Sequence, residues 1–253
     1  MSESACRRGD FSAIGHAGDV SPTDFVRATG LHRALSKTLA PWRKPLSRHD
    51  PGKIILDAAI ILALGGDALS DIAVLRAKTA VYSQVASDPT NSRTIAALAG
   101  DVSRVEAAVA TARRSARQAA WVRDGEHAPG IARLPGEPVV VDLDATLTTA
   151  HSEKEDARST FKRGFGFNPL IASVDHGQGG TGEKPAMRLR PGNAGSNTLD
   201  EHIDGAFAQL PGINPWRPGR SILDRADGAV GTKGFLARLT MRRVACCDVR
   251  AGC

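Results

Sequence analysis

Two short apolar segments that each end in acidic residues constrain the fold of this chain more than any other feature. They are Val139-Val-Val-Asp-Leu-Asp-Ala-Thr-Leu147 and Ser221-Ile-Leu-Asp-Arg-Ala-Asp227. Runs of β-branched and apolar residues favour buried strands, so we expect two central strands with acids near their ends. Carboxylates held by such strands can share divalent metal ions, which activate the attacking oxygen and stabilise the leaving oxygen of a phosphodiester.

Charge and composition narrow the class of protein. The 253 residues carry a formal net charge of +6, and most of the cations are Arg, which forks onto phosphate oxygens better than Lys does. Nucleic acid is therefore a candidate partner. No apolar run approaches the roughly 20 residues of a membrane span, so we expect no membrane partner. The four cysteines show no CxxC spacing, which favours a reducing, cytoplasmic compartment.

The pattern changes from helical to strand-like along the chain. Residues 1–21 are small and polar and are expected to be a disordered leader. Residues 22–128 read as a helical, DNA-binding region, residues 129–138 as a linker, and residues 139–253 as a sheet-containing domain. Helices are expected over residues 21–40, 53–64, 67–76 and 96–121, with a further helix that begins near Asn91.

Two of these helices are candidates for a helix-turn-helix. Residues 71–75 and 91–98 would be its two arms, with Asn91, Ser92 and Arg93 at the start of the recognition helix, where base edges are reached. The alternative is a helical bundle that reads no bases.

The second half predicts a mixed sheet. Strands are expected at 139–141, within 161–174, at 222–223 and at 243–249, with helices at 199–210 and 232–239. The fold class is therefore α/β: a helical N-terminal region followed by an incomplete ribonuclease H-like mixed sheet with flanking helices.

The segment Asp142-Leu-Asp-Ala-Thr146 also resembles the first motif of haloacid dehalogenase-like phosphatases. In that reading Asp142 is the nucleophile, Asp144 is the acid, and Asp224 with Asp227 forms the later acidic pair. A third reading is that these acids simply end strands at the surface.

A longer series of blocks resembles DDE-type insertion-sequence transposases in order and spacing over roughly residues 28 to 245. The blocks are Asp142-Leu-Asp-Ala-Thr146, His151-Ser-Glu-Lys-Glu155, Phe161-Lys-Arg-Gly-Phe-Gly-Phe-Asn-Pro-Leu170, Asp175-His-Gly177, Leu189-Arg-Pro-Gly-Asn-Ala-Gly-Ser-Asn-Thr198 and Asp224-Arg-Ala-Asp-Gly228. Several separate blocks are more specific than one DxDxT, which leaves the phosphatase as the alternative.

The resemblance implies catalytic, metal-binding acids at Asp144 and Asp227, with Asp142 and Asp224 as alternates. It implies Mg²⁺ (or Mn²⁺) as cofactor, and cleavage and strand transfer at the ends of a bacterial insertion sequence. The implied partner is double-stranded DNA, namely terminal inverted repeats and target DNA, with a homodimer as the candidate assembly. Cations between the acids are expected to contact phosphates, or else to be ordinary surface cations: Lys154, Lys162, Arg163, Arg188 and Arg190.

The family usually carries a further helix with a catalytic Glu beyond the last strand, whereas this sequence ends at Ala251-Gly-Cys253. We therefore expect a C-terminally truncated, weakly active or inactive transposase. A non-catalytic DNA-binding repressor of transposition is a further alternative.

Overall fold

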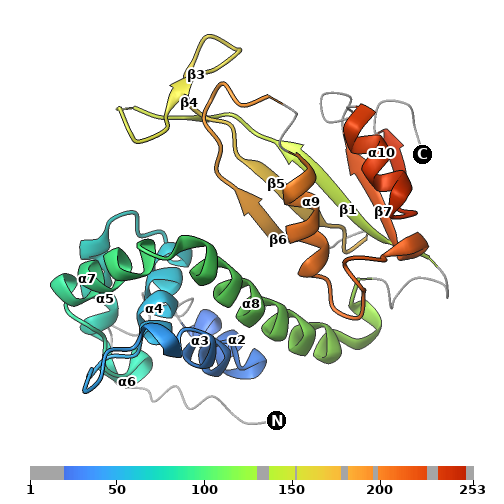
Figure 1. Cartoon of the computed structure of the whole chain (residues 1–253). Coiled ribbons are helices and arrows are strands. Elements are labelled where there is room, and N and C mark those ends of the chain that lie inside the picture. Colours follow the sequence, from blue (N-terminus) through green and yellow to red (C-terminus); the bar gives the residue numbers. More distant parts are fainter. Residues whose placement is uncertain are drawn as a thin grey trace. The chain divides into compact units, whose positions relative to one another are not determined.

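The structure is a computed structural model that describes residues 20–129, 137–151, 153–177, 182–195, 199–226 and 233–248. The chain divides into two compact units, Met1–Ala119 and Ala120–Cys253. This division lies within a long helix and precedes the predicted linker 129–138, most of which lies outside the described residues. The first unit is helical, and the second contains all the described strands (Figure 1).

The helical unit is built from several short helices and one long one. They are α2 (Val20–Thr29), α3 (Leu31–Thr38), η2 (Ala40–Trp42), α4 (Pro51–Ala63), η3 (Leu69–Asp71), α5 (Ile72–Arg76), α6 (Thr79–Tyr82), α7 (Asp88–Ala99) and α8 (Val102–Asp124), the last of which continues into the second unit.

Local residue chemistry sets the ends of these helices. Gly30 adopts a left-handed φ of 71° and separates α2 from α3, where the sequence predicted one helix. The Asp50 side chain accepts a hydrogen bond from the Lys53 backbone N–H and caps α4, and Pro51 occupies its first turn. The sequence also missed the short helix α6. Its four residues are too few to show a helical period.

The core of the helical unit joins α3, α4 and α5 through buried aliphatic side chains such as Leu35, Ile60 and Leu75. Helices α3 and α4 meet at Gly52, where an added Cβ would lie 2.5 Å from the backbone nitrogen of Ser36. The two backbones therefore approach more closely than any side chain at this position would allow.

The strand unit contains one large sheet and one small one. Its elements are η4 (Gly125–His127), β1 (Val139–Ala145), β2 (Thr148–Thr149), β3 (Arg158–Ser159), β4 (Phe165–Phe167), β5 (Leu170–Val174), β6 (Glu183–Arg188), α9 (Leu199–Ala208), η6 (Gly219–Ser221), β7 (Ile222–Ala226), α10 (Lys233–Met241) and β8 (Ala245–Asp248). The large sheet has the order β6-β5-β1-β7-β8, and the small one has the order β2-β4-β3.

Strand β1 lies at the centre of the large sheet, as its β-branched run predicted. It pairs antiparallel with β5, which pairs antiparallel with β6, and it pairs parallel with β7, which pairs parallel with β8. The mixed α/β fold class is therefore confirmed, and the sheet with its flanking helices is consistent with a ribonuclease H-like core.

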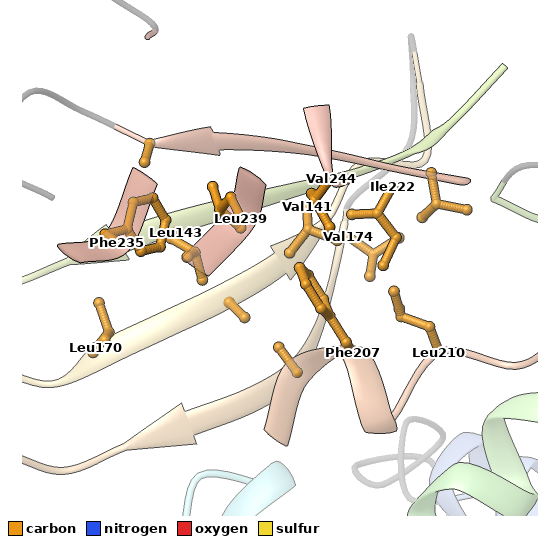
Figure 2. Packing of buried hydrophobic residues seen from close by; sticks show 14 of the residues in the cluster. Val141, Leu143, Leu170, Val174, Phe207, Leu210, Ile222, Phe235, Leu239 and Val244 are labelled. Atoms are coloured by element: carbon orange, nitrogen blue, oxygen red, sulfur yellow. The ribbon is translucent and has the colours of Figure 1, made fainter. Parts of the chain in front are cut away.

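One face of the large sheet forms the hydrophobic core of this unit. Val141 and Leu143 of β1 point to this face and pack with Phe207 of α9 and Phe235 of α10 (Figure 2). All four side chains are at most 3% exposed. Because side chains alternate along a strand, the residues between them in β1 point to the other face. The sheet therefore has an apolar face under α9 and α10 and a face that receives Asp142 and Asp144.

Candidate active site

Asp144 lies near the end of β1 as an exposed carboxylate. It shares its face of the sheet with Asp142, two residues earlier, because both alternate with the buried Val141 and Leu143. The Thr146 hydroxyl donates a hydrogen bond to Oδ2 of Asp144 at 3.0 Å. The Asp144 carboxylate is thus oriented by its own chain and accessible, which a metal ligand or phosphate-directed acid requires.

Asp142 is bound by an arginine from the neighbouring strand. Nε of Arg225 donates to one carboxylate oxygen of Asp142 at 2.6 Å, and Nη2 donates to the other at 2.8 Å. Asp142 and Arg225 are direct partners in the parallel pairing of β1 with β7, so the guanidinium can form a bidentate hydrogen bond with the carboxylate. The hydrogen bond to Asp142 is the main reason that the pKa of Arg225 is raised.

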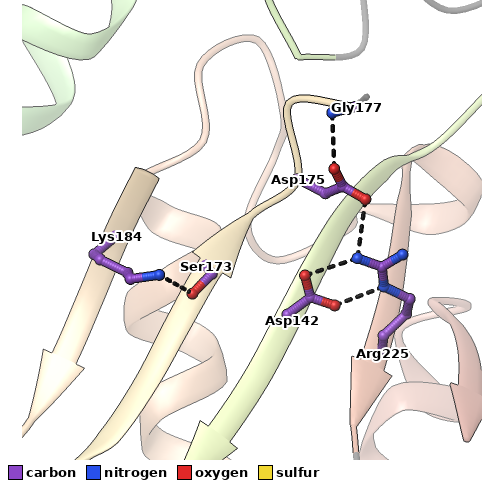
Figure 3. A network of polar contacts seen from close by, with 6 residues as sticks. All are labelled: Asp142, Ser173, Asp175, Gly177, Lys184 and Arg225. Atoms are coloured by element: carbon purple, nitrogen blue, oxygen red, sulfur yellow. Dashed lines mark hydrogen bonds and ion pairs between the residues drawn. The ribbon is translucent and has the colours of Figure 1, made fainter. Parts of the chain in front are cut away.

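A second acid completes this network. Nη2 of Arg225 also donates to Oδ2 of Asp175 at 2.9 Å, and Asp175 accepts a hydrogen bond from the backbone N–H of Gly177 (Figure 3). Asp175 follows directly after β5, so the network spans β5, β1 and β7 on the face that carries Asp144. One guanidinium is shared by two carboxylates and offsets one of their two negative charges, and Asp142 is bound to Arg225 through both of its oxygens.

Asp224 lies on the opposite face of the sheet. It pairs in register with Val141 of β1, is fully buried, and shares the apolar face with that residue. Burial, and to a smaller extent the negative charge of Asp142, together raise the pKa of Asp224 from its ordinary 3.8 to about 7. Neither carboxylate oxygen has a hydrogen-bond partner among the residues that the structure describes. Asp224 is therefore a core residue, and the alternates Asp142 and Asp224 cannot converge on one ion.

Asp227, the predicted second acid, lies outside the described residues. It follows Ala226 in sequence, and Ala226 pairs with Leu143, the residue before Asp144.

The predicted phosphate contacts Lys154, Lys162 and Arg163 are all exposed and belong to the segment that carries the small sheet. We call the described residues of 148–167, with strands β2, β4 and β3, the arm. The arm begins just after β1 and ends just before β5, so it extends from the end of the sheet that bears Asp144 (Figure 1). The structure thus groups three of the predicted cations on one substructure.

Arg190 has a different environment, since its side chain is buried and 5% exposed. Its Nε donates to the Asn168 carbonyl and its Nη1 to the Gly195 carbonyl, each at 3.0 Å. Burial is the main cause of its lowered pKa. This placement supports a structural role at the base of the arm. Arg188, by contrast, is exposed on β6.

The two helices predicted as arms of a helix-turn-helix are separated by a connection longer than such a motif has. Helices α5 and α7 are present, but residues 77–87, including α6, separate them, whereas such motifs use turns of about 3–4 residues. Asn91 is fully buried and donates to the Ala86 carbonyl at 3.2 Å, so it supports the start of α7 from within the core. Ser92 and Arg93 are exposed.

Sequence reasoning did not assign Arg225 or Asp175 to the site. Both lie inside blocks that resemble the transposases, and alternation along Ile222-Leu-Asp-Arg-Ala226 places Arg225 and Asp224 on opposite faces. The register that sets Arg225 beside Asp142 is a tertiary property that one sequence does not display.

The described residues contain neither a ready-made cluster of metal ligands nor a helix that could span a membrane. No group of three or more His, Cys, Asp or Glu side chains that could hold a metal ion occurs among them. In the same part of the chain, no helix has the length and apolar character that crossing a membrane requires.

Comparison with known proteins identifies the family. The family model described as transposase DDE domain group 1 matches residues 12–247, which include nearly all of both units. No curated protein matches the chain, and no solved structure does. DDE transposases typically use a divalent metal, and their partner is DNA. The chain belongs to the transposase DDE domain group 1 family.

Proposed function

We propose that this transposase binds the ends of a bacterial insertion sequence and catalyses metal-dependent DNA cleavage and strand transfer. The observation that carries the proposal is the exposed Asp144 at the end of the central strand, on the polar face and beside the network centred on Arg225. A carboxylate at the end of a central strand, held away from the apolar core, is accessible to an ion and to DNA.

The proposed metal ligands are Asp144 and Asp227, and the proposed ion is Mg²⁺ or Mn²⁺. The donor set fits, because hard divalent cations prefer carboxylate oxygens and Asp144 offers an exposed one. When bound, such an ion activates the attacking oxygen and stabilises the leaving oxygen at phosphorus. Asp142 is a poorer ligand in this proposal, since both its oxygens already accept hydrogen bonds from Arg225.

The other residues of the site bind and orient. Arg225 offsets one of the two negative charges of Asp142 and Asp175, which lowers the repulsion that a DNA phosphate would meet near Asp144. The exposed cations Lys154, Lys162 and Arg163 are proposed to contact phosphates along the arm. We propose that Arg190 contributes by holding the base of the arm. The proposed setting is the cytoplasm, with a homodimer as the assembly.

Localised cleavage by bound iron tests the metal site without relying on transposition. Fe²⁺ that replaces the proposed ion generates hydroxyl radicals that cut the protein backbone nearby. We expect cuts near residues 144 and 227 in the wild type and their loss in Asp144→Asn. The exposed acid Glu153 on the arm provides the control Glu153→Gln, which should leave the pattern unchanged. An unaltered pattern in Asp144→Asn contradicts the assignment.

Assays on DNA separate the alternatives. Metal-dependent nicking of terminal-repeat DNA that requires Asp144 supports the transposase reaction. End-specific, salt-sensitive binding without nicking supports the non-catalytic repressor. Hydrolysis of a small phosphomonoester that Asp142→Asn abolishes would support the phosphatase, although the bidentate bond to Arg225 makes Asp142 a poor nucleophile.

A further inference from the structure

The tip of the arm is a tight turn with an unusual composition. Thr160 and Gly164 close it: the backbone N–H of Thr160 donates to the Gly164 carbonyl at 2.8 Å, and the Gly164 N–H donates to the Thr160 hydroxyl at 3.0 Å. Between them lie Phe161, Lys162 and Arg163. The turn therefore presents one aromatic and two cationic side chains in succession.

Arg163 occupies the position at which such turns favour glycine. Its φ is 61°, in the left-handed region, and three-residue hairpin loops commonly place a left-handed residue third. A left-handed conformation costs a residue with a Cβ roughly 1–2 kcal/mol. The sequence has arginine at this position despite the cost, and the glycine, Gly164, stands one position later.

The arm below the tip is tightly packed. A Cβ on Gly166 would lie 2.1 Å from the Thr148 carbonyl oxygen, and a Cβ on Gly192 would lie 2.4 Å from the Arg158 carbonyl oxygen. The Gly192 N–H also donates to the Gly166 carbonyl at 3.0 Å. These backbone contacts hold the arm in shape, so the tip is presented by a packed support.

Phe161 is exposed in a way that core packing does not explain. Its side chain is 75% exposed, and the ammonium of Lys162 lies 5.8 Å from the centre of its ring. Residues 159–167 contain two cations and no acid, so the sequence neighbours of the ring are positive. An exposed ring beside cations matches the chemistry of an unstacked nucleic-acid base, whose face stacks on an aromatic side chain while its phosphates meet the cations.

We propose that the tip of the arm binds an unpaired nucleotide of DNA, with Phe161 stacking on the base and Lys162 and Arg163 contacting the flanking phosphates. This inference rests on the proposed function, because it takes DNA as the partner, and it adds a preference for DNA with unpaired bases. The arm extends from the end of β1 that bears Asp144, so this nucleotide would lie on the same side of the strand unit as the proposed cleavage site.

Binding of the full chain to two matched DNAs tests the inference. One is a blunt duplex, and the other carries a short single-stranded overhang that contains 2-aminopurine, whose fluorescence reports stacking. Stacking on an aromatic contributes about 1–3 kcal/mol per base, so we expect Phe161→Ala to weaken overhang binding by about 5- to 150-fold. Blunt-duplex binding should change little.

Matched variants distinguish the contribution of the Phe161 ring to DNA binding from that of the neighbouring cations. Phe161→Trp should keep the preference for the overhang and the fluorescence change, whereas Phe161→Leu should lose both. Lys162→Ala should weaken binding to both DNAs and reduce its salt dependence. Met241→Ala removes a side chain that is 78% exposed on α10 and should affect neither.

Each remaining outcome is also decisive. If the wild type binds both DNAs equally and Phe161→Ala has no effect, the inference is wrong and the proposed function stands. Equal losses on both DNAs in Phe161→Ala would show that the ring supports duplex binding only, which also overturns the inference. If the wild type binds neither DNA, the inference and the proposed function fail together.

Discussion

Asp142 and Asp224 lie on neighbouring, parallel strands but on opposite faces of the sheet. The first is bound to Arg225 on the polar face, and the second is buried among apolar side chains. In the sequence, Asp142 looks as suitable for metal binding as its neighbour Asp144, and Asp224 looks as suitable as Asp227. The structure nevertheless gives Asp142 and Asp224 unrelated roles. Asp144 is therefore the accessible acid of β1. Asp142 contributes to the ion-pair network, whereas Asp224 affects the stability of the core.

Removal of Arg225 should destabilise the strand unit. Arg225→Ala leaves Asp142 and Asp175 close together without their shared cation. Because these side chains are about a quarter to a third exposed, solvent screens part of the effect, and we expect a loss of about 1–2 kcal/mol in the free energy of unfolding. Urea denaturation measures this, with Arg217→Ala at an exposed loop position as the control. Equal stability of the two variants would show that the network is not stabilising.

Asp224 should make stability depend on pH in a defined direction. Because its folded-state pKa is raised to about 7, the folded state holds the proton more tightly than the unfolded state does. Its contribution is complete below the ordinary pKa and is lost as the pH rises through about 7. We expect Asp224→Asn to remove this dependence, so that the stability gained over the wild type grows by a few kcal/mol between about pH 4 and pH 8. A difference that is constant in urea titrations across this range would contradict the prediction.

Gly52→Ala should disrupt the helical unit. The added methyl group would lie 2.5 Å from the Ser36 nitrogen and 2.6 Å from the Leu35 carbonyl carbon, and backbone atoms cannot move aside as a flexible side chain can. We expect a loss of at least about 2 kcal/mol, as for an overpacked core. Gly100→Ala is the control, because its nearest neighbour would be 3.4 Å away and its φ is −70°. Thermal unfolding by circular dichroism compares the two.

Gly192→Ala should loosen the arm without unfolding the large sheet. Its Cβ would collide with carbonyl oxygens of Arg158 and Gly166, which form part of the small sheet. Limited trypsin digestion measures this loosening, because trypsin cleaves after Lys162 and Arg163. Cleavage there should be slow in the wild type and faster in the variant. Gly195→Ala adds a Cβ with no heavy atom within 4 Å and should behave as the wild type does. Equal digestion rates in both variants would argue against a rigid arm.

The central features of the fold were accessible from the sequence because they rest on local patterns. The β-branched run of β1 and the apolar run of β7 predicted buried strands, and the structure places them side by side at the centre of the sheet. The helices of the first half were also expected. Their breaks were less visible, because the left-handed Gly30 splits one predicted helix and Gly100 with Asp101 splits another.

What the sequence could not show depends on register and burial. Arg190 and Asn91 look like surface polar residues in the sequence, yet both are buried in the structure and donate hydrogen bonds to backbone carbonyls. Strands β2 and β3 have two residues each, too few for any alternation to be read. The role of Arg225 follows only from the pairing of β1 with β7, which joins distant parts of the chain.

That pairing also sets the order in which the chain can fold. The helical unit relies on contacts close in sequence, whereas β1 and β7 can meet only after the arm, β5, β6 and α9, which lie between them in the chain, have been synthesised. Contacts of this kind form slowly because a long loop must close before they are gained. During synthesis, β1 therefore has no partner on its β7 side until late, and the salt bridge between Asp142 and Arg225 can serve as a marker of this long-range pairing.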